Sequence, residues 1–166
     1  MFLLQQYQIK SIFHISSKVL SKITKAKQEA DIVIALPHIG GQYNPGPGEY
    51  TKYIVHSMCD AGADAIIAGH PHTSHRCEIM KKDGKTILCA YSLGNMCFTP
   101  EIGYYCQNTL ADYGIILHLY LNVAKKRIEK VSFDVTKCIC NDEGFTIVVP
   151  VASQYNDESN LEKKKN

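Results

Sequence analysis

The sequence predicts an α/β fold in which a βαβ unit is followed by antiparallel strands. Two short apolar runs, residues 31–36 and 64–68, flank a segment with helical periodicity, and this order is typical of a βαβ unit with a right-handed crossover. Beyond residue 75 the pattern changes to short strands separated by turn-forming residues, which indicates hairpins. The 166 residues, 45% hydrophobic and 20% charged, suit one globular domain with a substantial core.

The first helix is expected to begin at about Ser17, because Ser16 or Ser17 can cap it and apolar residues follow at helical spacing. The stripe expected to face the core consists of Val19, Ile23, Ala26 and Ala30. Residues 31–36 then form a β-branched apolar run without alternation. Such a run predicts a strand that is buried on both faces, as in a parallel sheet.

A loop rich in glycine and proline follows at residues 40–48 and cannot be helical. Residues 49–61 are predicted to form the second helix, which Gly62 ends. The core-facing residues of this helix are expected to be Tyr50, Ile54, Met58 and Ala61. Residues 64–68 are predicted to form the second buried strand.

The carboxyl-terminal half is predicted to consist of hairpins. Residues 76–80 and 86–91 form one pair of strands around the turn-forming sequence Lys82-Asp83-Gly84. Three further strands are predicted at Tyr113–Leu121, Arg127–Val135 and Phe145–Val149. Residues 1–152 are assigned to one domain, and 153–166 to a polar, disordered tail.

The charge balance and the cysteines exclude several classes of protein. The formal net charge is only +2, from 18 Lys and Arg against 16 Asp and Glu, so we expect no nucleic-acid partner and no polybasic membrane contact. No apolar stretch approaches the roughly 20 residues that a membrane span needs. Seven scattered cysteines without a Cys-x-x-Cys pair predict free thiols, and these favour a reducing compartment such as the cytoplasm.

Both buried strands run into histidine where they end. His38 closes the first strand, and His70 and His72 close the second. Ligands of parallel sheets bind beyond the carboxyl ends of the strands, so these three imidazoles predict a metal site. Pro71 favours extended backbone at His70, which would place His70 and His72 about 6–7 Å apart, a separation that suits one metal or two adjacent metals. His75 is assigned either to a supporting role behind the site or to the surface.

Other histidines and polar motifs carry weaker signals. His14, His56 and His118 lie in expected helix or strand and are interpreted as structural. Asn95 follows a strand, where it either presents its amide to a ligand or belongs to an ordinary turn. Cys138-x-Cys140 has no partner cluster, so a zinc module is not expected.

Four motifs, in the same order, resemble the second half of the bacterial capsule-synthesis CapA family, also called the poly-γ-glutamate biosynthesis proteins. They are His38-Ile-Gly-Gly-Gln-Tyr43, Asp60-Ala-Gly-Ala-Asp64, Gly69-His70-Pro71-His72 and Ser92-Leu-Gly-Asn95, within a resemblance that covers about residues 17–135. This family belongs to the calcineurin-like metallophosphatase superfamily. The resemblance therefore implies an α/β/β/α sandwich with a site for two divalent metals at the strand ends.

The resemblance also implies roles for individual residues. His38 and His70 match ligands of one metal, and His72 matches a ligand of the other, with Mn, Zn or Fe as the expected ion. Asn95 is expected to line the site, and Asn95 and His75 are the candidate substrate-binding residues. The catalytic residues are not assigned.

The chain also departs from the family pattern. Ile39 and Gln42 replace a tryptophan and a glutamate, and the early Gly-Asp, Asn-x-Glu and Asn-Asn-His motifs are missing. We therefore expect a domain without its amino-terminal half, with no bridging carboxylate and one weakly bound metal at best. A sandwich domain that lacks its amino-terminal half is also expected to expose apolar surface and to self-associate through it.

Two functions follow from the resemblance. The first is a metal-dependent hydrolase of the phosphatase or phosphodiesterase type, which acts on a phosphoryl-type small substrate and has poor activity in this form. The second is a non-catalytic binding or scaffold component in the assembly or export of an anionic cell-surface polymer. The resemblance suggests attachment at the cell surface, whereas the thiols favour the cytoplasm.

Overall fold

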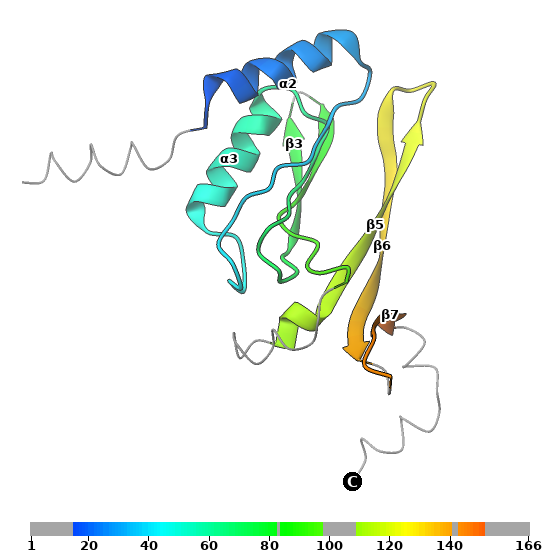
Figure 1. Ribbon diagram of the computed structural model, residues 1–166. Helices are drawn as coiled ribbons and strands as arrows, with labels where there is room; N and C mark the ends of the chain where they lie inside the picture. The colour runs from blue at the N-terminus through cyan, green and yellow to red at the C-terminus, as the bar shows by residue number, and fades with distance from the viewer. Residues whose placement is uncertain (1–14, 83, 98–108, 141–142, 152–166) are drawn as a thin grey trace, which may run out of the picture.

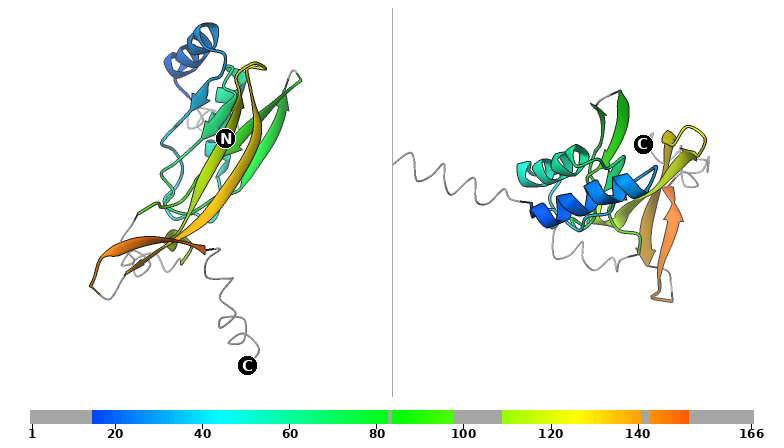
Figure 2. Two further views of the ribbon diagram at one scale, coloured as in Figure 1. Left: turned by 90° about the vertical axis from the view of Figure 1, so that its right-hand side faces the viewer. Right: turned by 90° about the horizontal axis from the view of Figure 1, so that it is seen from above.

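The computed structural model describes residues 15–82, 84–97, 109–140 and 143–151, and it has a mixed α/β fold with two sheets. The first sheet has the strand order β1-β2-β4-β3, and the second has the order β5-β6-β7. The helices α2 and α3 cover one side of the first sheet, and the long β5–β6 hairpin lies on its other side (Figures 1 and 2). The predicted order, a βαβ unit followed by antiparallel strands, is confirmed, whereas the predicted tail at 153–166 lies outside the described residues.

Helix α2 (Ser17–Glu29) begins where the sequence predicts, because the hydroxyl of the N-cap Ser16 accepts a hydrogen bond from the Lys18 amide at 3.3 Å. Its buried residue is Ile23, and Leu20 packs beside it. Val19 is 40% exposed, so its assignment to the core was wrong. Helix α2 contacts α3 over only a short stretch. The part of the apolar stripe of α2 that is buried is therefore narrower than the periodicity suggests.

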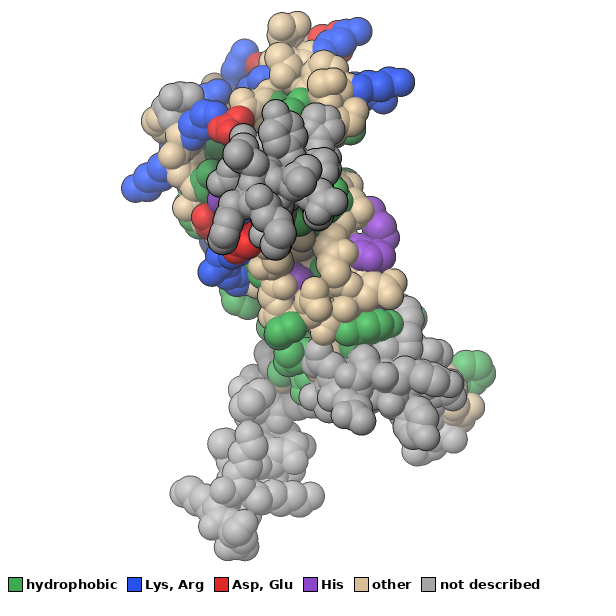
Figure 3. Space-filling view, turned by 90° about the vertical axis from the view of Figure 1, so that its left-hand side faces the viewer, with side chains coloured by type: hydrophobic (Ala, Val, Ile, Leu, Met, Phe, Trp, Pro, Cys, Tyr) green, Lys and Arg blue, Asp and Glu red, His purple; other side chains and the backbone are tan. Residues whose placement is uncertain are grey.

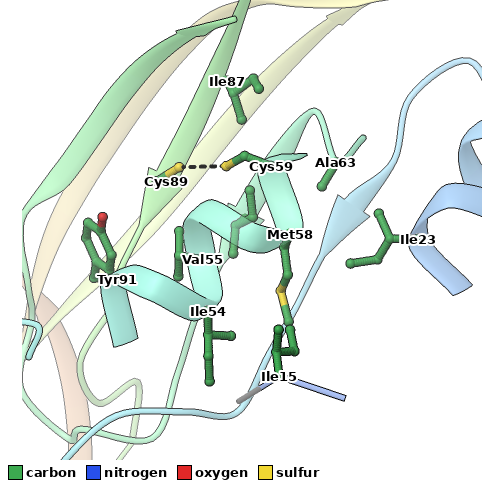
Figure 4. Close-up of a cluster of buried hydrophobic side chains, with 11 residues drawn as sticks. Ile15, Ile23, Ile54, Val55, Met58, Cys59, Ala63, Ile87, Cys89 and Tyr91 are labelled. Carbon is green, nitrogen blue, oxygen red and sulfur yellow. Dashed lines mark hydrogen bonds between the residues drawn. The ribbon is translucent and has the colours of Figure 1, made fainter. Parts of the chain in front are cut away.

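Helix α3 (Glu49–Asp60) supplies most of the helical core, and it ends before Gly62, whose φ of +110° favours glycine. Its buried residues are Thr51, Ile54, Val55, Met58 and Cys59. Tyr50 is 41% exposed, contrary to prediction, because the buried face is centred one position further along the helix. Together with α2 and the first sheet, α3 encloses the core cluster shown in Figure 4.

The two parallel strands differ in burial because they occupy different places in the sheet. Strand β2 (Ala65–Ile67) is central, pairing with β1 on one side and β4 on the other, and it is buried as predicted. Strand β1 (Ile34–Ala35) lies at the edge of the described sheet. Ile34 is 37% exposed and Leu36 is 74% exposed, so the prediction of burial on both faces is wrong for this strand.

The predicted hairpins are present. Strands β3 (Cys77–Lys82) and β4 (Lys85–Ala90) pair antiparallel around Gly84. In the second sheet, β5 (Tyr113–Asn122), β6 (Arg127–Cys140) and β7 (Thr146–Pro150) pair antiparallel, and a short 3-10 helix, Thr109–Asp112, precedes β5. The sheets join where the Ile115 amide donates to the Leu93 carbonyl at 2.7 Å.

The core contains a pair of thiols, as the prediction of free cysteines implies. The sulfurs of Cys59 and Cys89 lie 3.5 Å apart between α3 and β4, and both residues are free thiols (Figure 4). The contact with Cys59 and burial raise the pKa of Cys89 far above its usual value. These cysteines therefore act as small apolar core residues.

One carboxylate ties the amino-terminal helix to the parallel strands. Asp64, directly before β2, accepts hydrogen bonds from the Lys27 ammonium at 2.6 Å and from the Val33 amide at 2.8 Å. The carboxyl is only 15% exposed, so both contacts are shielded from water. Charge-assisted bonds of this kind contribute more than an exposed ion pair.

We expect Asp64→Asn to lower the free energy of unfolding by about 1–3 kcal/mol, because it removes the charge from both contacts. Asp60→Asn is the matched control, since Asp60 forms an ion pair with Lys82 but its side chain is 67% exposed. That control should cost less than about 1 kcal/mol. Urea unfolding measures both values, and equal losses in the two variants would contradict the proposed anchoring role of Asp64.

Candidate metal centre

The parallel pairing of β1 and β2 extends past both strands and carries histidines to one edge. His38 forms an isolated parallel bridge with Gly69, and the Ile39 amide donates to the Gly69 carbonyl at 2.8 Å. His38 and His70 therefore emerge side by side beyond the carboxyl ends of adjacent strands, as the sequence predicts. Exposed histidine side chains are visible at the molecular surface in Figure 3.

His38 and His70 form a close pair. Nε2 of His38 lies 2.9 Å from Nδ1 of His70, and the two rings meet edge to face with centroids 4.7 Å apart. This separation is that of a hydrogen bond between the two rings, in which one ring nitrogen donates to the other. Two nitrogens that each lie about 2.0–2.1 Å from a tetrahedral ion would be about 3.4 Å apart, so the two rings would need to separate by only about 0.5 Å to bind one ion.

His72 stands apart from this pair. Its ring centroid is 6.4 Å from that of His70, and the ring stacks on Tyr43 with centroids 5.3 Å apart. Among the described residues, no three His, Cys, Asp or Glu side chains are grouped closely enough to hold a metal ion. The structure therefore brings His38 and His70 together and holds His72 beside them, without a carboxylate in the group.

Asn95 fixes the orientation and the tautomer of His72. The Asn95 amide nitrogen donates to the carbonyls of His72 at 3.1 Å and Ala111 at 2.8 Å, so its amide oxygen faces Nδ1 of His72 at 2.9 Å. An amide oxygen only accepts, so Nδ1 carries the hydrogen and Nε2 carries the lone pair. Histidines that bind metals are oriented in this way by a neighbouring acceptor.

Asn95 is only 7% exposed, and its side-chain amide is directed to protein partners. We therefore assign it a positioning role behind His72. The sequence placed Asn95 near the site but gave no indication of which residue it would hold.

His75 supports the loop around the site. It is 5% exposed, and its Nε2 lies 2.8 Å from the carbonyl oxygen of Asn44, to which it donates. The Thr73 hydroxyl donates to the same carbonyl at 2.6 Å. Of the two alternatives for His75, the surface position is therefore wrong. Its Nδ1 is buried and has no hydrogen-bond partner among the described residues.

The backbone around the imidazoles is strained. Tyr43, His70 and His72 have φ values of 58°, 121° and 61°, which non-glycine residues rarely adopt. The extended backbone expected at His70 is therefore wrong. The Tyr43 amide donates to the Pro71 carbonyl at 2.7 Å, and this contact holds the two loops together. Strain of about 1–3 kcal/mol per residue persists where surrounding structure enforces it, often at functional sites.

The remaining histidines have structural partners where they are described. His56 contacts the Tyr91 hydroxyl at 3.1 Å, and that hydroxyl donates to Glu78 at 2.7 Å. Burial and then Glu78 raise the pKa of Tyr91. His118 pairs with Asp134 at 2.7 Å, and His14 lies outside the described residues. Tyr43 was not predicted to contact His72, although it is the aromatic residue that ends the His38–Tyr43 motif.

Comparison with known families agrees with the motif resemblance. Residues 5–100 match the sequence model of the bacterial capsule synthesis protein family PGA_cap, which is more than half of the chain. The chain belongs to this family.

Two relatives show how much of a family member the chain represents. It is 40% identical over 76 residues to the PGA biosynthesis protein CapA of Bacillus subtilis and 34% identical over 84 residues to the capsule biosynthesis protein CapA of Bacillus anthracis. These segments cover 46% and 48% of the chain but only 19% and 20% of the relatives. In the part of this PGA_cap chain that the structure describes, no helix is long and apolar enough to cross a membrane.

The hydrogen bonds of Asn95 predict a single tautomer for His72. We expect nitrogen chemical shifts to show the hydrogen on Nδ1 of neutral His72, and Asn95→Ala to abolish that preference. The variant should also lose about 1–3 kcal/mol of stability, because buried carbonyls lose a donor. A neutral His72 that carries its hydrogen on Nε2 would contradict the assignment.

Proposed function

We propose that this chain forms the histidine-bearing part of a metal-dependent, hydrolase-like domain that acts in capsule or poly-γ-glutamate synthesis. The observation that carries the proposal is the convergence of His38 Nε2 and His70 Nδ1, 2.9 Å apart, at the ends of two parallel strands. Family membership and the names of the two Bacillus relatives supply the biological setting.

The layer order supports a metallophosphatase-type sandwich. Helices, the first sheet and the second sheet follow one another across the molecule, which corresponds to three layers of an α/β/β/α arrangement (Figure 1). Ile116 and Tyr120, which lie four residues apart on β5 and therefore on the same face of the second sheet, are 40% and 48% exposed. This apolar surface is consistent with a further covering layer, and the expected self-association through it stays a prediction.

The donor set fits one divalent ion of the Zn, Mn or Fe type. His38 and His70 would supply two imidazole nitrogens to this ion, and the lone pair on Nε2 of His72 would serve a second ion beside it. When bound, such an ion polarises a phosphoryl group and lowers the pKa of a water. Tyr43 and Asn95 hold the His72 ring in a fixed orientation.

Binding of a second ion would require negatively charged ligands, and the cluster of His38, His70 and His72 provides none. Two divalent ions a few ångströms apart repel strongly unless carboxylates offset their charge. The lack of a carboxylate among the described residues of the group also favours the alternative function, a non-catalytic component that binds an anionic polymer during assembly or export. For the hydrolase function, the proposed substrate is a phosphoryl-type small molecule.

Calorimetric titration with Mn²⁺ or Zn²⁺ tests the metal site. We expect saturable binding by the metal-free protein and a loss of at least about tenfold in affinity in His38→Ala and His70→Ala, because each removes one of two ligands. His118→Ala is the matched control, since His118 lies on β5 and pairs with Asp134. Equal heats in all three variants would overturn the metal site.

Turnover of bis-p-nitrophenyl phosphate separates the two functions. Metal-dependent turnover that disappears in His38→Ala supports the hydrolase. Metal binding without turnover supports the binding or scaffold component.

A further inference from the structure

A cavity lies at the other end of the parallel strands, away from the histidines. Its volume is about 440 Å³, and it separates the β3–β4 turn from the β5–β6 turn. The tips of these two hairpins lie at the same end of the molecule as α2 (Figure 2). Asp64, at the amino end of β2, forms part of the wall, whereas His70 follows the carboxyl end of the same strand.

The described lining of this cavity is rich in positive charge. Its ionisable members are Lys85, Lys125, Lys126, Arg127, Asp64 and Glu129. Four cations face two carboxylates, which leaves the lining with an excess of two positive charges. The chain as a whole carries only +2, so this excess is concentrated rather than spread over the surface.

Both carboxylates are already engaged. Asp64 binds Lys27 at 2.6 Å. Glu129 accepts hydrogen bonds from Asn122 at 3.0 Å and Lys125 at 3.1 Å, with Arg127 at 3.5 Å. These hydrogen bonds lower the pKa of Glu129 to about 2, so its charge is constant at physiological pH. Neither carboxylate is available to neutralise the other lining cations.

Of the four cations in the described lining, Lys85 is the one that takes part in no such contact. It lies at the start of β4 on the cavity wall, and its side-chain ammonium forms no ion pair or hydrogen bond with the described residues. Lys126 reaches Asp31 at 2.9 Å, and this ion pair ties the β5–β6 turn to the segment before β1. The turn that carries three of the cations is thereby held against the first sheet.

We propose that this cavity binds a small, multiply charged anion through its carboxylate or phosphate oxygens. The volume lies within the range of about 300–1,000 Å³ that small-molecule sites occupy. The Lys85 ammonium would form new charge-assisted bonds, and Lys125 and Arg127 can share their donors between Glu129 and the ligand. The Thr86 hydroxyl on the wall adds a neutral donor. This site is separate from the histidines, and it does not depend on the proposed function.

Calorimetry at low ionic strength tests the proposal with two probes, tricarballylate for carboxylates and inorganic phosphate. We expect saturable binding of at least one probe, weakened as salt rises. Lys85→Ala/Lys125→Ala should bind that probe at least about tenfold more weakly, because two charged contacts are lost. The probe that binds more tightly identifies the oxygen chemistry of the ligand.

The control variant is Lys18→Ala/Lys22→Ala, which removes the same charge from exposed positions on α2 outside the cavity lining. It should bind the probes as the unmodified protein does. Equal weakening in both double variants would show general electrostatic attraction and overturn the site, as would the absence of saturable binding for both probes. Lys85→Glu, with folding checked by circular dichroism, repeats the test with a single substitution.

Discussion

The side-chain amide of Asn95 is the contact on which the arrangement of this protein most depends. It joins the loop that carries His72 to the Ala111 carbonyl, which lies just before β5. Directly beside it, a Cβ on Gly114 would lie 2.1 Å from the Asn95 carbonyl oxygen, so only glycine allows this approach. One buried residue thus connects the end of the first sheet to the start of the second and sets the direction of an imidazole.

The two ends of the parallel strands have opposite chemical characters. The carboxyl ends present imidazole nitrogens on a strained backbone, without a described carboxylate in the group. The amino ends present lysine and arginine around a cavity. The two proposed sites would place a bound cation and a bound anion at opposite ends of the parallel strands in this member of a capsule synthesis family.

Most helices and strands could be predicted from the sequence, because the spacing of apolar residues indicates which positions are buried and glycine indicates where the chain turns. The hairpin around Gly84 and the helix cap at Ser16 illustrate this local information. The exposure of Ile34 could not be predicted, since the same apolar run is compatible with a central or an edge strand. The pairing of His38 with His70 followed from topology, whereas the left-handed backbone at His70 and the stacking of His72 on Tyr43 depend on contacts between distant loops.

The positive φ angle of His70 has a consequence for evolution of the family member described here. Glycine at this position would adopt the same backbone without a steric penalty, so selection for thermostability alone would tend to discard the imidazole. His70 therefore holds a backbone conformation that costs stability, as residues at functional sites often do. The position trades a part of the folding free energy of the domain for an imidazole at the end of a strand.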